Sequence, residues 1–282
     1  MKSQIGAFKR PVLHYNLAMA KEKDPAKAIE TLFELEGGRL HSLARRFCKN
    51  EEEAQDLVQD VFLSALKSWD QFDGRSKPST WLYTIAARRC QRNQRKRAGE
   101  PEQLETLEEL MPNDEKPMGI VPEASSPEGQ LLRKEALESL EMAIASLPAD
   151  FRMPLVLRDI VGLSVRDVAS VLGLEETTVR TRVHRARLKT RQAIENALPK
   201  QELPPTPYSQ QVCIDLLAAK QEALDRGVPC PIENEVVCSR CQALFSSLDL
   251  GQDLCQTLGE ASAPKELEAL IMGQIRAFRG SS

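Results

Sequence analysis

The feature that most constrains the fold of this chain is a pair of predicted helices separated by a glycine, within residues 147–198. Ser164 can cap the first helix, with Asp167 three residues further on. The apolar residues that follow recur at the spacing of one helix face: Val165, Val168, Ala169 and Leu172. Gly173 predicts the end of this helix, and a second helix is expected from about Thr177. The pattern is typical of a helix-turn-helix.

The second helix of the pair is strongly basic. Its expected inward-facing residues are Val179, Val183, Ala186 and Ile194. Six basic residues and no acidic residue lie between Thr177 and Ile194: Arg180, Arg182, Arg185, Arg187, Lys189 and Arg191. Such a helix fits the major groove of duplex DNA, where arginines contact phosphates or guanine edges. An ordinary solvated basic helix is the alternative, but the single sign of the charge directly after the turn favours DNA binding.

The outward-facing side chains of this helix divide into two predicted groups. We expect Thr178, Thr181, Arg182 and Arg185 to reach the bases, because they face away from the apolar stripe. We expect Arg180, His184, Arg187 and Lys189 to hold the phosphate backbone.

A second block, residues 54–97, places an amphipathic helix before an aromatic and basic one. The first helix has an apolar stripe with a polar outer face made of Asp56, Gln59 and Asp60. After Gly74 a polar loop leads to a helix that carries Trp81, Tyr83 and six basic residues in the ten from 88 to 97. Aromatic rings beside arginines suit unstacked bases. Core packing is an equally plausible role for Trp81 and Tyr83.

In their order and spacing, the two blocks resemble an extracytoplasmic-function sigma factor of bacterial RNA polymerase. The resemblance covers roughly residues 29–198 and is carried by DLVQDVFLSAL, STWLYTIA and GLSVRDVASVLGL. It implies a first domain (region 2) that binds core polymerase and opens the −10 promoter element. It implies a second domain (region 4) that binds the −35 element. Catalytic motifs are absent from the sequence, so we expect a dissociable polymerase subunit and not an enzyme.

The resemblance also assigns roles to residues of region 2. The positions that match the polymerase-binding helix are Asp56, Leu57, Gln59, Asp60 and Phe62. Phe72, Gly74 and Ser76 match the loop that captures a flipped promoter base. The positions in the −10 helix are Trp81, Arg88, Arg89, Arg92 and Arg95. Arg88 and Arg92 replace the asparagine and aspartate frequent in the family, which leaves the −10 preference open, and Glu175 replaces a small capping residue.

Composition predicts small helical domains. Aromatic residues make up only 5% of the 282-residue chain, and strand-like alternation is absent from the sequence. We expect an all-α protein with region 2 at 25–98, region 4 at 135–199 and a regulatory domain at 208–282. No apolar run reaches the length of a membrane helix, and the amino terminus lacks the pattern of a signal peptide. A cytoplasmic location is therefore expected.

The net charge of −3 conceals a strong segregation of charge. Residues 100–130 hold nine acidic residues and one basic residue, together with five prolines. This composition predicts an acidic, extended or disordered linker at 99–134. Two roles stay open for it: a mimic of nucleic acid near the polymerase, or a soluble spacer.

Five of the seven cysteines lie in the C-terminal extension: Cys213, Cys230, Cys238, Cys241 and Cys255. Cys238 and Cys241 form a CxxC pair, a spacing that lets two thiolates share one tetrahedral ion. The pattern resembles the zinc-binding anti-sigma fold, but Asn234 stands at the histidine position. We predict a site of Cys213, Cys230, Cys238 and Cys241, with Cys255 as a spare or switching ligand.

An all-sulfur site would suit Zn(II), Cu(I) or Cd(II). Such cysteine-rich tails resemble the metal-responsive sigma factors, so one reading is that the tail senses a metal and controls access to polymerase. A permanent structural zinc and a thiol redox switch are the alternatives. Cys48 and Cys90 are expected to be ordinary packed thiols.

The extension carries eleven acidic and six basic residues from Gln201 onward. An acidic tail beside basic helices could cover them, so we predict that removal of the chain after Leu198 raises promoter binding. The main rival is a conventional helix-turn-helix regulator that does not join the polymerase. The region 2 block argues against this rival.

Overall fold

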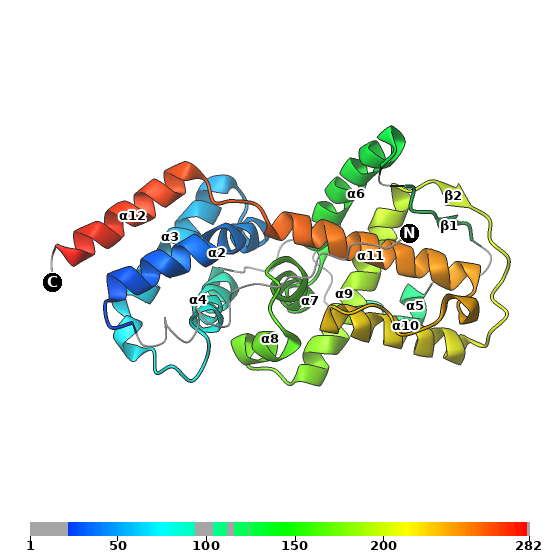
Figure 1. Ribbon diagram of the computed structural model, residues 1–282, viewed down its shortest axis with the longest axis horizontal. Coiled ribbons are helices and arrows are strands. Elements are labelled where there is room, and N and C mark those ends of the chain that lie inside the picture. Colours follow the sequence, from blue (N-terminus) through cyan, green and yellow to red (C-terminus); the bar gives the residue numbers. More distant parts are fainter. Residues whose placement is uncertain (1–21, 94–103, 112–115, 124, 281–282) are drawn as a thin grey trace.

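The computed structural model describes residues 22–93, 104–111, 116–123 and 125–280, and within them the protein is almost entirely helical (Figure 1). The expected all-α class is confirmed. The only sheet in these ranges is a short antiparallel pair, β1 (Met118–Gly119) with β2 (Lys200–Gln201). No described helix is both long enough and apolar enough to cross a membrane.

The N-terminal module consists of α2 (Pro25–Phe47), α3 (Glu51–Lys67), the short turn η1 (Trp69–Gln71) and α4 (Pro78–Asn93). Asp24 caps α2 and Asn50 caps α3 through their side-chain oxygens. Phe33 of α2 packs edge-on against Phe62 of α3, with ring centroids 5.1 Å apart. Tyr83 of α4 is fully buried among them. The apolar stripes of three helices thus form one core.

The second module contains α6 (Pro127–Ser146), α7 (Ala149–Leu155), the π-helical turn η2 (Val156–Ile160), α8 (Val165–Leu172) and α9 (Glu176–Asn196). Ser164 accepts a hydrogen bond from the backbone N–H of Asp167, as the sequence predicts for the start of α8. Gly173 ends α8 in the left-handed conformation, with φ of 66°. The expected helix-turn-helix is therefore α8 followed by α9.

The acidic segment between the modules is partly structured. A short helix, α5 (Leu107–Leu110), packs against α9, and β1 follows it. Thr106 and Glu109 form a reciprocal capping box around α5. Helix α6 begins at Pro127, inside the predicted linker, because Ser126 caps it there and proline is favoured in the first turn.

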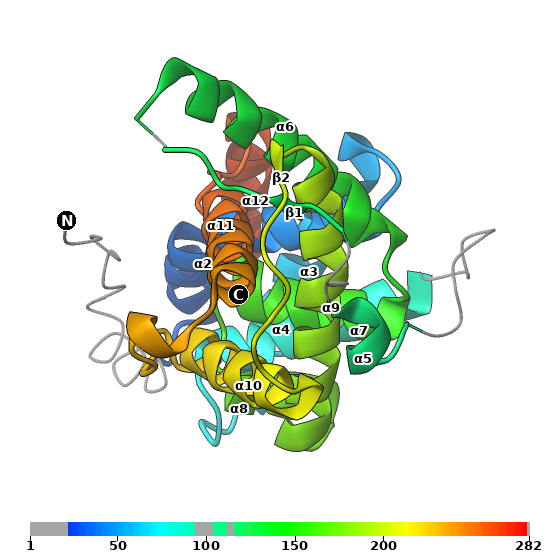
Figure 2. The same cartoon turned by 90° about the vertical axis from the view of Figure 1, so that its right-hand side faces the viewer.

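The C-terminal extension forms α10 (Gln210–Arg226), the turn η3 (Asn234–Val236), α11 (Ser239–Gly259) and α12 (Lys265–Arg279). It does not fold as a separate body. Helices α10 and α11 pack together and against α9, while α12 lies on α2 and α3 at the opposite end (Figures 1 and 2). Helix α11 therefore spans the molecule from the cysteines to the N-terminal module.

Two close backbone approaches fix the C-terminal end of α11 between the modules. A Cβ at Gly259 would lie 2.0 Å from the carbonyl oxygen of Ile160, and a Cβ at Gly38 would lie 2.3 Å from that of Ala261. Only glycine allows contacts this short. Ser42 also donates a 2.5 Å hydrogen bond to the carbonyl of Leu258. The turn after α11 is thus held against both η2 and α2.

Candidate DNA-binding surface and cysteine cluster

Helix α9 has the apolar face that the sequence predicts. Val179, Val183, Ala186 and Ile194 are all fully buried. The opposite face carries the residues expected to read bases. Thr181 is exposed, whereas Thr178, Arg182 and Arg185 are partly covered. Arg182 lies near Asp150 and Arg180 near Glu176, so both make ion pairs within region 4.

Arg187 lies in a buried ion-pair network and not on an open surface. Its guanidinium donates to both carboxylate oxygens of Asp159, at 2.8 and 2.7 Å, and to Asp225 of α10 at 2.8 Å. Burial alone would lower the pKa of Arg187, but the two carboxylates outweigh it and raise the pKa. Arg187 was expected to hold a DNA phosphate. In this arrangement it is only 5% exposed and cannot do so, because Asp225 takes that position.

Asp225 also binds His184, another residue expected at the DNA backbone. Their Nε2 and Oδ2 atoms lie 2.8 Å apart. Burial would raise the pKa of Asp225, but His184 and Arg187 lower it overall. From region 4, Arg158 donates to the backbone carbonyls of Leu224 and Asp225 at the end of α10. A cation at a helix C-terminus is favourable, so Arg158 of η2 helps to hold α10 on region 4.

Two further basic residues of α9, Arg185 and Lys189, face the segment between the modules. The Arg185 guanidinium donates to the backbone carbonyls of Leu104 and Glu105, and Lys189 pairs with the Glu105 carboxylate. The bond with Lys189 is the main reason that the pKa of Glu105 is lowered. Two separate parts of the chain, α10 and the segment between the modules, therefore contact basic side chains of α9.

In region 2, the residues matched to the polymerase-binding helix are of two kinds. Asp56 and Asp60 are exposed and Gln59 is partly exposed, so these polar side chains are accessible. Leu57 and Phe62 are 4% and 1% exposed and belong to the core. Their expected direct contact with polymerase is not available in this structure, because they pack inside the α2–α3–α4 bundle.

The residues matched to −10 recognition surround an aromatic cluster. Phe72 lies 5.1 Å from Trp69 and 5.4 Å from Trp81 between ring centroids. Arg88 and Arg92 are exposed, whereas Arg89 binds Asp60 at 2.6 Å. Gly74, with φ of 73°, and Ser76 lie in the loop before α4. Arg95 is outside the described residues.

The two DNA-binding modules touch each other directly. Lys77, just before α4, donates to Asp167 of α8 at 2.9 Å, and Thr80 donates to the same carboxylate at 3.4 Å. Further along, Arg46 of α2 binds Glu141 of α6 at 2.8 Å. The −10 helix and the helix-turn-helix therefore form one continuous surface in this state.

Three of the five C-terminal cysteines are close together. The Thr206 hydroxyl lies 3.4 Å from the Cys213 sulfur and 3.8 Å from that of Cys238, and the Cys241 thiol interacts with both thiols. We name Cys213, Cys238 and Cys241 the thiol cluster. Within the described ranges, no group of three or more His, Cys, Asp or Glu side chains has the geometry of a metal site.

The thiols of the cluster differ in their acid–base properties. Cys238 occupies the N-cap position of α11. Burial would raise the pKa of Cys238, but hydrogen bonds from the Cys241 backbone and the Thr206 hydroxyl lower it. Burial and the neighbouring Cys238 sulfur raise the pKa of Cys241. The Cys238 thiol therefore loses its proton more readily than the Cys241 thiol.

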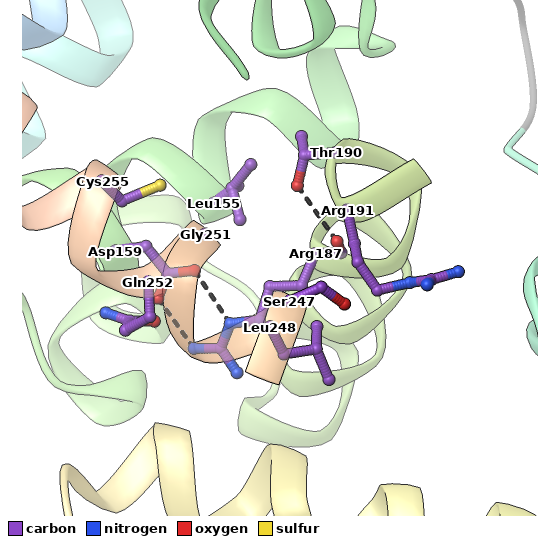
Figure 3. Close-up of a pocket in the computed structure, with 10 residues that line it drawn as sticks. All are labelled: Leu155, Asp159, Arg187, Thr190, Arg191, Ser247, Leu248, Gly251, Gln252 and Cys255. Carbon is purple, nitrogen blue, oxygen red and sulfur yellow. Dashed lines mark hydrogen bonds and ion pairs between the residues drawn. The ribbon is translucent and has the colours of Figure 1, made fainter. Parts of the chain in front are cut away.

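Cys230 and Cys255 are placed differently from the thiol cluster. Cys230 is half-buried and packs against the same apolar group as the cluster. Cys255 lines a small pocket between α11 and region 4, with Asp159 and Arg187 (Figure 3). It belongs to the other apolar core, so it cannot serve as a ligand to the cluster in this arrangement.

Comparisons with known proteins match both modules. The family model for Sigma-70 region 2 matches residues 32–100, and the model for Sigma-70 region 4 matches residues 137–190. Two solved structures also align, each at 24% identity. The complex of CnrH with the cytosolic domain of CnrY aligns over 64% of this chain and 95% of that one, with a TM-score of 0.45. The complex of the sigma factor RpoE with the anti-sigma factor NepR from Bartonella quintana aligns over 60% and 98%, with a TM-score of 0.44.

Curated relatives extend across both modules. The RNA polymerase sigma-H factor of Pseudomonas aeruginosa is 34% identical over 160 residues, which is 57% of this chain and 80% of that protein. The ECF RNA polymerase sigma-E factor of Escherichia coli is 31% identical over 175 residues, which is 62% of this chain and 88% of that protein. With both regions matched in the expected order, the chain belongs to the extracytoplasmic-function RNA polymerase sigma factors.

Proposed function

We propose that this sigma factor carries its own inhibitor: the C-terminal extension holds regions 2 and 4 together and covers the DNA-binding helix α9. As a sigma factor the chain is a transcription initiation factor and not an enzyme. It would direct core RNA polymerase in the cytoplasm to specific promoters. The proposal adds a means of keeping the free chain inactive until polymerase, DNA or another signal opens it.

The contact between Lys77 and Asp167 is the observation that carries this proposal. By the positions that name them, the −10 and −35 elements lie about 25 base pairs apart, or roughly 85 Å at about 3.4 Å per base pair. The two modules touch in this structure, with a nitrogen–oxygen distance of 2.9 Å. They cannot bind both elements in this state, so the modules must separate before promoter binding.

The turn after α11 is placed to prevent that separation. It contacts region 2 at Gly38 and Ser42 and region 4 at Ile160. Helix α12 then continues over α2 and α3, burying Leu267, Ile271 and Ile275. The extension therefore bridges the two modules, and its release would free both.

A matched pair of glycine substitutions tests the inhibitory role. At Gly38, the nearest atoms that an added Cβ would meet all belong to residues 261–263 of the extension, so Gly38→Ala should loosen the extension without disturbing region 2. Gly273→Ala in α12 is the control, because a Cβ there meets nothing within 4 Å. Fluorescence anisotropy with a duplex from upstream of the gene should show tighter binding for Gly38→Ala only. Equal affinities for the two variants would contradict autoinhibition.

For the extension we further propose a soft metal ion, Zn(II) first and Cu(I) or Cd(II) as alternatives, held by the thiol cluster. The donor chemistry fits, because the Cys241 thiol interacts with those of Cys213 and Cys238, and Cys230 packs against the same apolar group. A fourth ligand from Cys230 would complete a tetrahedral set. A bound ion would cross-link the start of α10 to the start of α11 and so set how firmly the extension is folded.

Metal binding is testable apart from transcription. Purified full-length protein should retain about one zinc per chain by mass spectrometry of the metal content. Cys238→Ser should lose it, while Cys48→Ser in region 2 should keep it. Transcription with core polymerase should then change between zinc and a chelator for the wild type and Cys48→Ser, but not for Cys238→Ser. Zinc retained at full stoichiometry by Cys238→Ser would refute the proposed ligand set.

A further inference from the structure

We propose that the segment between regions 2 and 4, in its described parts 104–111 and 116–119, is a second inhibitory element: a lid that occupies part of the DNA-contacting side of α9 and is fastened by Arg240 of the CxxC motif. This inference rests on the proposed sigma function but concerns a part of the chain outside the C-terminal extension. It accounts for the contacts of Arg185 and Lys189, whose partners are Leu104 and Glu105 and not residues of the extension.

The lid supplies the groups that a DNA backbone would supply. The backbone carbonyl of Glu105 accepts from Arg185 Nε at 2.9 Å, the Leu104 carbonyl accepts from Arg185 Nη2, and the Glu105 carboxylate accepts from Lys189. Oxygen acceptors facing one arginine and one lysine of a recognition helix resemble phosphate oxygens in charge and chemistry. DNA cannot reach these two side chains while the lid is in place.

Apolar anchors on both sides of the contact hold the lid on region 4. Leu104 is 5% exposed and packs in the larger core, and Leu110 is fully buried in the core that includes Leu188 of α9. Beyond them, β1 pairs with β2, and the N–H of Ile120 donates to the carbonyl of Pro199 at 2.9 Å. The contacts of the two described parts of the lid thus lie at the middle of α9 and at its C-terminal end.

Arg240 connects this lid to the cysteine region. Its Nη1 donates to the backbone carbonyl of Lys116, two residues before β1, at 3.1 Å. Its Nε and Nη2 donate to the carbonyls of Pro204 and Leu203, just after β2, at 2.8 and 2.7 Å. The planar guanidinium of Arg240 thus uses several of its N–H donors to join the two chain segments that carry the paired strands.

The position of Arg240 links the lid to the proposed metal site. Arg240 stands between Cys238 and Cys241 in the first turn of α11, and it is 7% exposed. Leu110 and Met118 of the lid pack in the same apolar group as Cys213 and Cys241. A change in how these thiols are bound should therefore move the Arg240 donors that hold the carbonyls of Lys116, Leu203 and Pro204.

A charge reversal in the lid tests the proposal in the full-length protein. Glu105→Lys places a cation against Lys189, and because Glu105 is exposed, the variant should fold. Glu123→Lys, at an exposed position of the same linker, is the control with an identical charge change. Acetylation of Lys189 by a limiting reagent, mapped by peptide mass spectrometry and normalised to exposed Lys134, reports whether the lid is open.

The expected result is faster acetylation of Lys189 and tighter binding of the upstream duplex for Glu105→Lys alone. The gain should be roughly two- to five-fold, the range for one exposed ion pair. Arg240→Lys keeps the positive charge but loses the planar set of guanidinium donors, so it should also speed acetylation of Lys189. Unchanged acetylation in Glu105→Lys would overturn the lid, and equal gains in DNA binding for Glu105→Lys and Glu123→Lys would overturn its inhibitory role.

These outcomes separate the lid from inhibition by the extension. Tighter DNA binding by Glu105→Lys but not by Gly38→Ala would support the lid and refute the inhibitory role of the extension. Tighter DNA binding by Gly38→Ala but not by Glu105→Lys would support inhibition by the extension and refute the inhibitory role of the lid.

Discussion

Carboxylates from other parts of the chain form ion pairs with several side chains of α9 that were expected to meet DNA, among them His184 and Arg187. Asp225 of α10 is the most connected of them, because it binds both His184 and Arg187. Its side chain is 4% exposed, so the pair with Arg187 is shielded from solvent. A buried ion pair adds little net stability, but the loss of one partner leaves a costly unpaired charge. Asp225 thus determines both how α10 docks and how α9 is blocked.

Asp225→Asn should weaken the docking of α10 and release α9. Arg187 keeps Asp159 as a partner, so we expect the free energy of unfolding to fall by about 1–3 kcal/mol, the cost of one poorly satisfied buried group. Thermal unfolding would measure this loss, and anisotropy with the upstream duplex should show tighter binding. Asp215→Asn on the exposed side of α10 is the control. Weaker DNA binding by Asp225→Asn would contradict the role of Asp225 as a blocking group.

The same carboxylate predicts an acid-dependent loss of stability. The pKa of Asp225 is lowered from its ordinary value of 3.8 in the folded protein. A group with a lowered folded pKa contributes stability above its unfolded pKa and loses it as the pH falls towards the folded value. Unfolding followed from pH 6 to pH 3 should therefore show a decline below about pH 4 that is smaller in Asp225→Asn. Identical pH profiles would show that Asp225 contributes nothing to the decline.

Helix α12 attaches the extension to region 2 through one apolar stripe. Leu267, Ile271 and Ile275 are at most 3% exposed, whereas Leu270, one residue before Ile271, is 48% exposed. The stripe follows the helical repeat, and the exposed positions are polar or solvated. The contact with α2 and α3 is therefore a packing interaction that a single charge could break.

Ile271→Asp should detach α12 from α2 and α3. A carboxylate cannot be buried there without a partner, so the helix is expected to leave the surface. Hydrogen exchange should rise strongly in residues 265–279 and more weakly in α2. Leu270→Asp carries the same change at an exposed position and should exchange like the wild type. Equal exchange in the two variants would mean that α12 is not held by this stripe.

Local patterns in the sequence predict the elements but not their long-range contacts. The Ser164 cap, the Gly173 stop and the buried face of α9 all follow from spacings within a few residues. The pairing of Arg187 with Asp225 joins positions 38 residues apart, and Gly38 meets Ala261 from the other end of the chain. A charge run shows that arginines are present, but it cannot show which carboxylates cover them.

The cysteines illustrate the same limit. The CxxC spacing correctly places Cys238 and Cys241 at the first turn of one helix, because that relation is local. Cys213 joins them through the packing of α10 on α11, whereas Cys255 lies in the other core, beside Asp159. The sequence predicts Cys213 as a ligand and Cys255 only as a spare, but spacing alone could not show that the two lie in different cores. In addition, burial of Leu57 and Phe62 in region 2 depends on how three helices meet.

On this proposal, the whole molecule is a sigma factor held closed by two of its own segments. The extension bridges regions 2 and 4, and the lid contacts Arg185 and Lys189 of α9. Regions 2 and 4 share one continuous apolar core in this state, with the end of α11 included. Opening must therefore separate packed surfaces, so a change at either segment should shift the balance between closed and open forms.

In vitro transcription by full-length Gly38→Ala and Gly273→Ala with core RNA polymerase tests the central claim most directly. The template is DNA from upstream of the gene, and the yield of specific transcript is measured at limiting sigma concentration. Autoinhibition predicts more transcript from Gly38→Ala than from Gly273→Ala or the wild type, with all three converging when sigma is in excess. Transcript yields that stay equal at every concentration, with both variants folded, would contradict it.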